Sequence, residues 1–288
     1  AVIGDVLSFG PATPLPLVSP GPDPSYPRAR MAAGGEELVF SARKMAGSPD
    51  TDIALALRDG DAWQDGVFGT GVGITTLSPE WAPLRLPAGV QVPDVVGAEL
   101  ILFNAFNPGG RRQIYAATPD AATKTAVPNL NDPLKDSYSP AMAWELNPPR
   151  YWYMRRIGAA DQLRFVTQRA GELTATPIAA VSLPGGCTVD LALTPDLAPW
   201  VTPNGSHLFF QADYPAACDN EAQARRGFWV PLTPITGVPT GPAEEIPIEG
   251  IAAGQQVSTP SLSPDLCSLY FSTTDANGAL ALHAARRR

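Results

Sequence analysis

The segment STPSLSPDLCSLYFST, residues 258–273, carries the clearest fold signal in this chain. It places Ser-Pro-Asp (263–265) in a short polar segment and follows it with the apolar triplet Leu-Tyr-Phe (269–271). Proline presets φ for a turn position, and an aspartate side chain can hydrogen-bond to the backbone that follows it. The stretch therefore predicts a strand, a chain-reversing turn and a second strand that carries the apolar triplet.

The same order of a proline, a turn and an apolar triplet occurs four more times. The other copies are YPRARMAAGGEELVFSAR (26–43), VPDVVGAELILFNAF (92–106), YSPAMAWELNPPRYWYMR (138–155) and APWVTPNGSHLFFQAD (198–213). The aligned prolines are Pro27, Pro93, Pro140, Pro199 and Pro260. Five units of about 58 residues account for the whole chain, and four-stranded repeats of this length are typical of β-propeller blades.

Each unit continues with two further strand patterns. The third strands are expected at DIALALR (52–58), QIYAAT (113–118), QLRFVTQR (162–169), GFWVPL (227–232) and ALALHAAR (279–286). Weaker outer strands are expected at GVGITTL (71–77), KTAVPNL (124–130), ELTATPIAAV (172–181) and AEEIPI (243–248). These patterns predict an all-β fold, a five-bladed β-propeller with four antiparallel strands in each blade.

The fifth unit ends after its third strand, which leaves one outer strand missing. The segment LSFGPATPLPLV (7–18) matches no other part of the chain, and we expect it to supply that strand and close the ring. Prolines at positions 11, 14 and 16 suit an outermost strand, where a missing N–H faces solvent. The chain is then one propeller domain, with blades at residues 25–77, 78–131, 132–183, 184–249 and 250–288 plus 5–18.

The repeats resemble the TolB-like, WD-repeat-related β-propeller family, whose repeat reads P-x-x-S-P-D-G-x-x-L-x-F-x-S. The matching residues of the fifth unit are Pro260, Ser263, Pro264, Asp265, Leu269, Phe271 and Ser272. Those of the fourth unit are Pro199, Thr202, Pro203, Asn204, Gly205, Leu208 and Phe210. The resemblance implies the propeller fold and often a periplasmic or surface location in bacteria, but no single activity, since propellers host many.

Charge and composition argue against several classes of function. The formal net charge is −8, so the chain lacks the basic surface that a nucleic-acid partner requires. No stretch approaches the roughly 18 apolar residues that cross a membrane. The sequence contains no phosphate loop and no G-x-S-x-G elbow, and its two histidines, His207 and His283, lie in different strands. We therefore expect no cofactor and no metal site.

The channel mouth is the first place where a ligand is expected. The residues that directly follow the aligned prolines include Arg28, Asp94, Trp200 and Ser261, and Asp136 lies near the start of the third inner strand. Together they make a plausible polar pocket with one aromatic ring for stacking. The alternative is that Arg28 and Asp94 only pair with each other between adjacent blades.

A second hypothesis is a glycan-active hydrolase. Asp94, Asp136 and Asp190 lie near the starts of inner strands and could converge on the channel. Glycoside hydrolysis uses two carboxyl groups about 5–10 Å apart, one of them with a raised pKa. Asp136 and Asp190 suit turn-forming roles equally well.

We expect two long loops on one face of the ring, here called the loop-rich face. This face carries the connections before the inner strands and those between second and third strands. The two loops are residues 80–91 and 211–226, and Trp81 and Tyr214 are their candidate interface anchors. Cys187 and Cys218 both fall in connections on this face, whereas Cys267 follows Ser-Pro-Asp on the opposite face. This placement predicts a Cys187–Cys218 disulfide and a free Cys267.

A disulfide indicates an oxidising compartment, so we expect a periplasmic or extracellular protein whose signal peptide has been removed. The sequence favours a binding or scaffold module for a protein or an extracellular glycan polymer, with the glycan-active hydrolase as the alternative.

Overall fold

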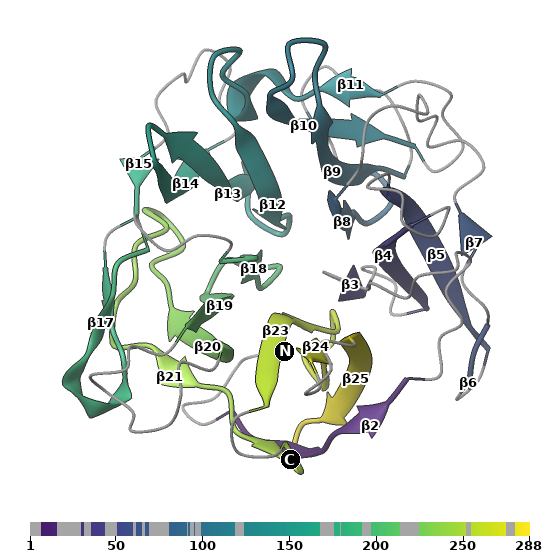
Figure 1. Ribbon diagram of the computed structural model, residues 1–288, viewed down its shortest axis with the longest axis vertical. Coiled ribbons are helices and arrows are strands. Elements are labelled where there is room, and N and C mark those ends of the chain that lie inside the picture. The colour runs from purple at the N-terminus through teal and green to yellow at the C-terminus, as the bar shows by residue number, and fades with distance from the viewer. Residues whose placement is uncertain are drawn as a thin grey trace.

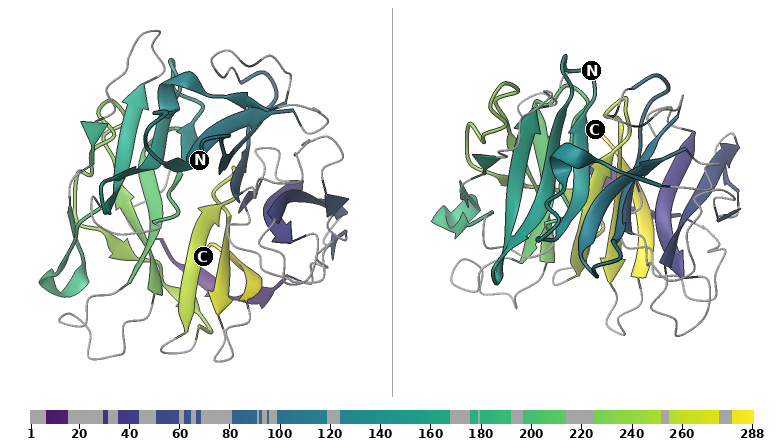
Figure 2. Two further views of the ribbon diagram at one scale, coloured as in Figure 1. Left: turned by 45° about the horizontal axis from the view of Figure 1, so that its top comes forward. Right: turned by 90° about the horizontal axis from the view of Figure 1, so that it is seen from above.

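The computed structural model is a ring of five antiparallel sheets arranged around a central axis (Figure 1). It describes residues 7–15, 30–31, 36–43, 51–59, 62–64, 67–68, 81–90, 92, 95, 99–118, 124–167, 176–178, 180–191, 197–213, 225–251, 255–274 and 280–288. The strands run from one face of the ring to the other, so their connections gather at the two faces (Figure 2). The five-bladed β-propeller predicted from the repeats is confirmed.

Each blade is numbered in chain order and its strands are given from the channel outwards. Blade 1 consists of β3 (Arg30–Met31), β4 (Glu37–Arg43), β5 (Thr51–Asp59) and the outer strands β6 (Ala62–Trp63) and β7 (Val67–Phe68). Blade 2 consists of β8 (Trp81–Arg85), β9 (Ile101–Phe106), β10 (Arg112–Ala117) and β11 (Thr125–Ala126). Blade 3 consists of β12 (Ser137–Ala143), β13 (Arg150–Ile157), β14 (Ala160–Thr167) and β15 (Thr176–Pro177).

Blade 4 consists of β18 (Trp200–Val201), β19 (His207–Asp213), β20 (Arg225–Pro231) and β21 (Glu244–Glu245). Blade 5 consists of β23 (Gln256–Leu262), β24 (Ser268–Thr274), β25 (Leu280–Arg286) and β2 (Thr13–Pro14). A peripheral hairpin of β16 (Val181–Ser182) and β17 (Thr188–Val189) lies between blades 3 and 4 in the sequence. Two 3₁₀ turns, η1 (Pro128–Leu130) and η2 (Pro184–Gly186), are the helical elements of the described residues.

The N-terminal segment closes the ring, as predicted. Thr13 and Pro14 of β2 pair antiparallel with Ala284 and His283 of β25, so the fourth strand of blade 5 comes from the other end of the chain (Figure 1). The segment also forms β1 (Phe9–Pro11), which pairs parallel with β22 (Ile248–Glu249). This second contact was not predicted, and it ties the segment to the stretch that joins blades 4 and 5.

The Ser-Pro-Asp turn has the role predicted for it. It joins β23 to β24, and the Asp265 carboxylate accepts a hydrogen bond of 3.0 Å from the backbone N–H of Cys267. The hydroxyl of Ser263 accepts a bond of 2.9 Å from the backbone N–H of Ser268. The equivalent Thr-Pro-Asn-Gly turn of blade 4 uses Gly205 at φ 71°, a conformation in which glycine carries no steric cost.

The apolar triplets fill the space between neighbouring blades. In blade 5, Leu269 and Phe271 pack with Phe209 on the blade 4 side, whereas Tyr270 packs with Leu38 on the blade 1 side. Successive side chains of a strand point to opposite faces of the sheet, so one triplet contributes to two cores. The propeller therefore has a series of cores between blades.

The inner strands bend at a proline. In blades 3, 4 and 5 the residue before that proline has a positive φ: Ser139 at 53°, Ala198 at 43° and Thr259 at 53°. Positive φ is uncommon for residues with a Cβ, and it is a clear outlier for a β-branched residue such as Thr259. Side-chain amides of the preceding blade hold two of these bends, because Asn104 Oδ1 accepts from the Ser139 N–H at 3.3 Å and Gln211 Oε1 accepts from the Thr259 N–H at 2.7 Å.

The register of the first two blades differs from the prediction. The register shift in β8 falls between Trp81 and Leu84, as it does around Pro140 and Pro260, so Pro83 is the bend proline of blade 2. Residues 81–85 are thus the inner strand and not part of a long loop on the loop-rich face. The prediction that placed Pro93 at the bend was wrong, because Pro83 and Pro93 carry the same local signal in the sequence.

In blade 1 the observed register of the inner strand differs from the predicted register by two residues. Arg30 pairs with Val39 in the same way that Trp200 pairs with Phe209, so Arg30 and not Arg28 follows the bend position. That position holds Ala29 in the sequence. No helix among the described residues is long and apolar enough to cross a membrane.

Candidate functional site

A buried arginine lies across the centre of the ring. Arg30 is 2% exposed, and it starts from the inner strand of blade 1. Its Nη1 donates to the carbonyl of Pro140 in blade 3 at 2.6 Å, and its Nη2 donates to the carbonyl of Pro199 at the start of blade 4 at 2.8 Å. A side chain that joins blade 1 to blades 3 and 4 must cross the axis, so Arg30 occupies the channel at this level.

The other predicted channel residues do not form a pocket beside it. Trp200 is 2% exposed and packs edge-on against Phe209, with ring centroids 5.4 Å apart, in the core between blades 4 and 5. Ser261 is fully buried in β23. Trp200 is therefore a core residue and not a stacking platform at the channel mouth. Arg28 and Asp94 lie outside the described residues.

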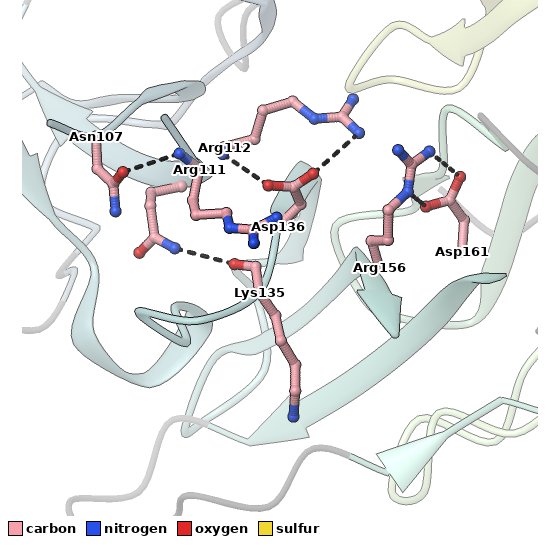
Figure 3. A network of polar contacts seen from close by, with 8 residues as sticks. Asn107, Arg111, Arg112, Lys135, Asp136, Arg156 and Asp161 are labelled. Atoms are coloured by element: carbon pink, nitrogen blue, oxygen red, sulfur yellow. Dashed lines mark hydrogen bonds and ion pairs between the residues drawn. The ribbon is translucent and has the colours of Figure 1, made fainter. Parts of the chain in front are cut away.

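Asp136, one of the predicted site residues, belongs to a polar cluster on the loop-rich face. It directly precedes β12, and its carboxylate accepts from the backbone N–H of Arg112 at 3.0 Å (Figure 3). The guanidinium of Arg112 is 3.6 Å from the same carboxylate and lies 4.0 Å from the centre of the Tyr138 ring. Asp136 thereby ties the start of blade 3 to β10 of blade 2.

A second carboxylate of the cluster comes from β14. Asp161 is 4% exposed and forms a two-bond pair with Arg156, with Nε–Oδ1 and Nη2–Oδ2 distances of 2.9 and 3.0 Å (Figure 3). Burial acts to raise the pKa of Asp161, but hydrogen bonds from Arg156 and Tyr138 outweigh it and hold the pKa below its ordinary value. Asp161 is therefore an ionised structural partner of Arg156.

The turn before β12 is held rigidly and carries an exposed leucine. The side chain of Asn131 bonds to both the N–H and the carbonyl of Ile114, each at 2.7 Å. Gln113 Nε2 donates to the carbonyls of Asp132 and Lys135 at 2.8 and 3.2 Å. Leu134 lies between these anchors with 79% of its surface exposed.

Basic side chains lie in this turn and in the two neighbouring hairpins, β9–β10 and β13–β14 (Figure 3). We call the set of Arg111, Arg112, Leu134, Lys135 and Arg156 the blade 2–3 surface. Asp132 and Lys135 pair at 3.1 Å, and the backbone N–H of Leu134 is the main cause that lowers the pKa of Asp132. Three of the four basic side chains of this surface form ion pairs, Arg112 with Asp136, Lys135 with Asp132 and Arg156 with Asp161. Sequence reasoning missed it, although the run NDPLKD (131–136) carries the turn signal and the exposed leucine.

The three aspartates of the hydrolase hypothesis do not come together among the described residues. Asp190 directly follows β17, which lies at the rim of the ring (Figure 1). Asp136 is paired with Arg112, and Asp94 lies outside the described part of the chain. A glycosidase acid requires a raised pKa, whereas the other two carboxyl groups of the Asp136 cluster, Asp132 and Asp161, have lowered values.

The histidines behave as strand residues. His207 lies in β19 beside Trp229, with ring centroids 5.3 Å apart, and burial lowers its pKa to about 4. His283 lies in β25 and accepts or donates a bond of 2.9 Å with the Thr273 hydroxyl. Within the described ranges, no group of three or more His, Cys, Asp or Glu side chains is arranged to hold a metal ion.

The structure describes some of the predicted loop anchors and cysteines. Trp81 begins the inner strand β8 and so is not in an interface loop. Tyr214 and Cys218 lie outside the described residues. Cys187 is half-buried and directly follows η2, and Cys267 lies in the turn between β23 and β24, where it was expected.

Comparison with known proteins supports the fold and leaves the family open. No family model and no curated protein matches the sequence. A thermostable family-43 glycoside hydrolase superposes with a TM-score of 0.55 and 11% identity over 96% of this chain and 92% of its own. The chain has the fold of a β-propeller.

Two further solved structures are similar to this chain. The GH43 endo-arabinanase from Bacillus licheniformis gives a TM-score of 0.54 and 11% identity over 92% of this chain and 94% of that one. A putative TolB from Agrobacterium tumefaciens gives 0.49 and 11% over 88% and 71%. Identities this low show a shared propeller fold alone, so function has to be argued from the site.

Proposed function

We propose that this propeller is an exported binding or scaffold module that docks an acidic protein partner on the blade 2–3 surface. The observation that carries the proposal is the exposed Leu134, held in a hydrogen-bonded turn that also carries Lys135. An apolar side chain that needs no reordering costs little entropy on binding, and the surrounding charges steer an acidic partner. The occupied channel supports a surface-binding role over a deep catalytic pocket.

A pair of matched variants tests this proposal. Leu134→Ser combined with Arg111→Glu should lower recovery of the native partner from the host's extracellular fraction by at least about tenfold, since apolar and charged contacts are lost together. Ile235→Ser is the control, because Ile235 is also exposed, at 73%, but lies in the turn after β20. Equal recovery by the double variant and the unchanged protein would contradict the proposal.

The alternative is a glycan hydrolase, and one observation favours it. The solved structures that cover nearly the whole chain with TM-scores above 0.5 include arabinan-degrading enzymes. Incubation with linear arabinan oligosaccharides separates the two functions. Under our proposal the protein releases no reducing ends from these oligosaccharides. If the unchanged protein releases reducing ends and the Asp136→Asn variant does not, the protein is a hydrolase.

We also propose the Cys187–Cys218 disulfide, which supports the exported location. Of the two described cysteines, Cys267 is an exposed free thiol and Cys187 is not. The bond closes a loop of about 30 residues and contributes roughly 3–4 kcal/mol in the chain-entropy model. A non-reducing peptide map should contain the 187–218 cross-link, and a cross-link through Cys267 would rule out this pairing and its assignment to one face.

A further inference from the structure

The seam between blades 5 and 1 contains a cavity that the proposed function does not use. Its volume is about 540 Å³, within the range of small-molecule sites. Its walls come from β24 and β25 of blade 5, from the β5–β6 hairpin of blade 1 and from the closing segment around β2. It lies beside the Ser-Pro-Asp turn, since its lining residue Ser268 begins the strand after that turn.

Strand register brings two arginines and two aromatic rings to this cavity. Arg58 pairs with Trp63 across the β5–β6 hairpin, so both side chains lie on the same side of blade 1. Arg286 pairs with Ser268, and Tyr270 lies two residues further along β24 on the same face of blade 5. All four side chains line the cavity.

Both arginines act on Tyr270. Burial is the main cause that raises the pKa of Tyr270, the charge of Asp265 adds to it, and the charges of Arg58 and Arg286 and a hydrogen bond with Ser268 act against it. None of the described lining residues is Asp or Glu, in a chain of net charge −8. Two guanidinium groups that line one cavity favour an anion there, because charge-assisted bonds from arginine to a planar carboxylate are strong.

The remaining lining groups suit a ring with hydroxyl groups. Trp63 is half-buried against the blade 1–5 core and leaves part of its indole accessible. Hydroxyl groups of Thr13, Ser268 and Tyr270 surround the same space. We propose that this cavity binds an anionic sugar ring, with its carboxylate between Arg58 and Arg286 and its apolar face on Trp63.

This inference does not rest on the proposed function, because the cavity and the blade 2–3 surface lie on different blades. The probes are α-1,4-linked trigalacturonate, its carboxyl-reduced neutral form, AMP and inorganic sulfate, each titrated by calorimetry into the full chain. We expect trigalacturonate to bind and the neutral form to bind at least about tenfold more weakly. Sulfate and AMP should each bind more weakly than trigalacturonate, since neither offers both a carboxylate and a sugar ring in the arrangement the cavity fits.

Variants assign the binding to the cavity. Arg286→Gln and Trp63→Ala should each weaken trigalacturonate binding by about tenfold or more, and Arg58→Gln with Arg286→Gln should abolish it. Arg111→Gln is the matched control, since it removes the same charge from an exposed position in blade 2, and it should change binding less than about twofold. Unchanged unfolding midpoints establish that the variants fold.

Four results would overturn the inference. They are absence of trigalacturonate binding, equal binding of the neutral form, tighter binding of AMP or sulfate, and equal weakening by Arg111→Gln and Arg286→Gln. The last result would indicate diffuse surface charge. The partner-recovery experiment with the Leu134 variant and the trigalacturonate titration measure binding to different surfaces. Failure of the docking proposal and failure of the cavity proposal can therefore be told apart.

Discussion

Deleting residues 1–15 should prevent this protein from folding to a stable monomer. The deletion removes β1 and β2, so it exposes the edge of β25 and leaves β22 without its partner. It also removes Leu7 and Phe9, which are 1% and 2% exposed in the core between blades 4 and 5. Burial of each such side chain contributes about 1.5–3 kcal/mol, which is a large part of the 5–15 kcal/mol that stabilises a typical domain.

Size-exclusion chromatography and urea unfolding measure the outcome. The truncated chain should aggregate through the exposed edge, or unfold at a much lower urea concentration than the full chain. Deletion of residues 1–4 is the control, because it stops before Leu7, the first buried residue of the part of the chain that the structure describes. Phe9→Ala should cost about 3–5 kcal/mol by itself. A monomeric truncated chain with an unchanged unfolding curve would show that the ring does not need this closure.

Replacing Arg30 with methionine should destabilise the whole ring. The change removes both charge-assisted bonds to the Pro140 and Pro199 carbonyls while keeping a long apolar stem. Hydrogen bonds to charged groups contribute about 1.5–3 kcal/mol each, and a buried carbonyl without a donor adds a desolvation cost unless water enters. We expect a loss of roughly 2–5 kcal/mol in the free energy of unfolding, measured by urea denaturation.

Two further arginine variants separate the geometry from the charge. Arg30→Lys keeps the charge but loses the planar fork that reaches two carbonyls, so its stability should lie between those of the unchanged protein and Arg30→Met. Arg111→Met changes an exposed arginine and should have little effect. If Arg30→Met and Arg111→Met unfold at the same urea concentration, the channel arginine does not stabilise the ring.

The blades themselves could be predicted because their signals are local. A Ser-Pro-Asp turn reverses the chain through its own side chains, and the alternation of the triplets is read over a few residues. The closing role of the N-terminal segment could be predicted from the number of strands in the repeats. The fifth repeat lacked an outer strand, and the N-terminal segment matched no repeat. Asp136 was also among the predicted site residues, because its position before an inner strand is visible in the sequence.

The tertiary structure alone decided which residues meet. Pro83 and Pro93 look alike in the sequence, and only pairing with β9 shows that the inner strand holds Pro83. Likewise, only pairing with β4 places Arg30, and not Arg28, at the position that reaches blades 3 and 4. Register between strands is set by contacts between residues far apart in the chain, and a shift of one residue reverses every side chain of a strand. The sequence by itself therefore determined the propeller and its closure, whereas the occupied channel and the blade 2–3 surface depend on long-range pairing.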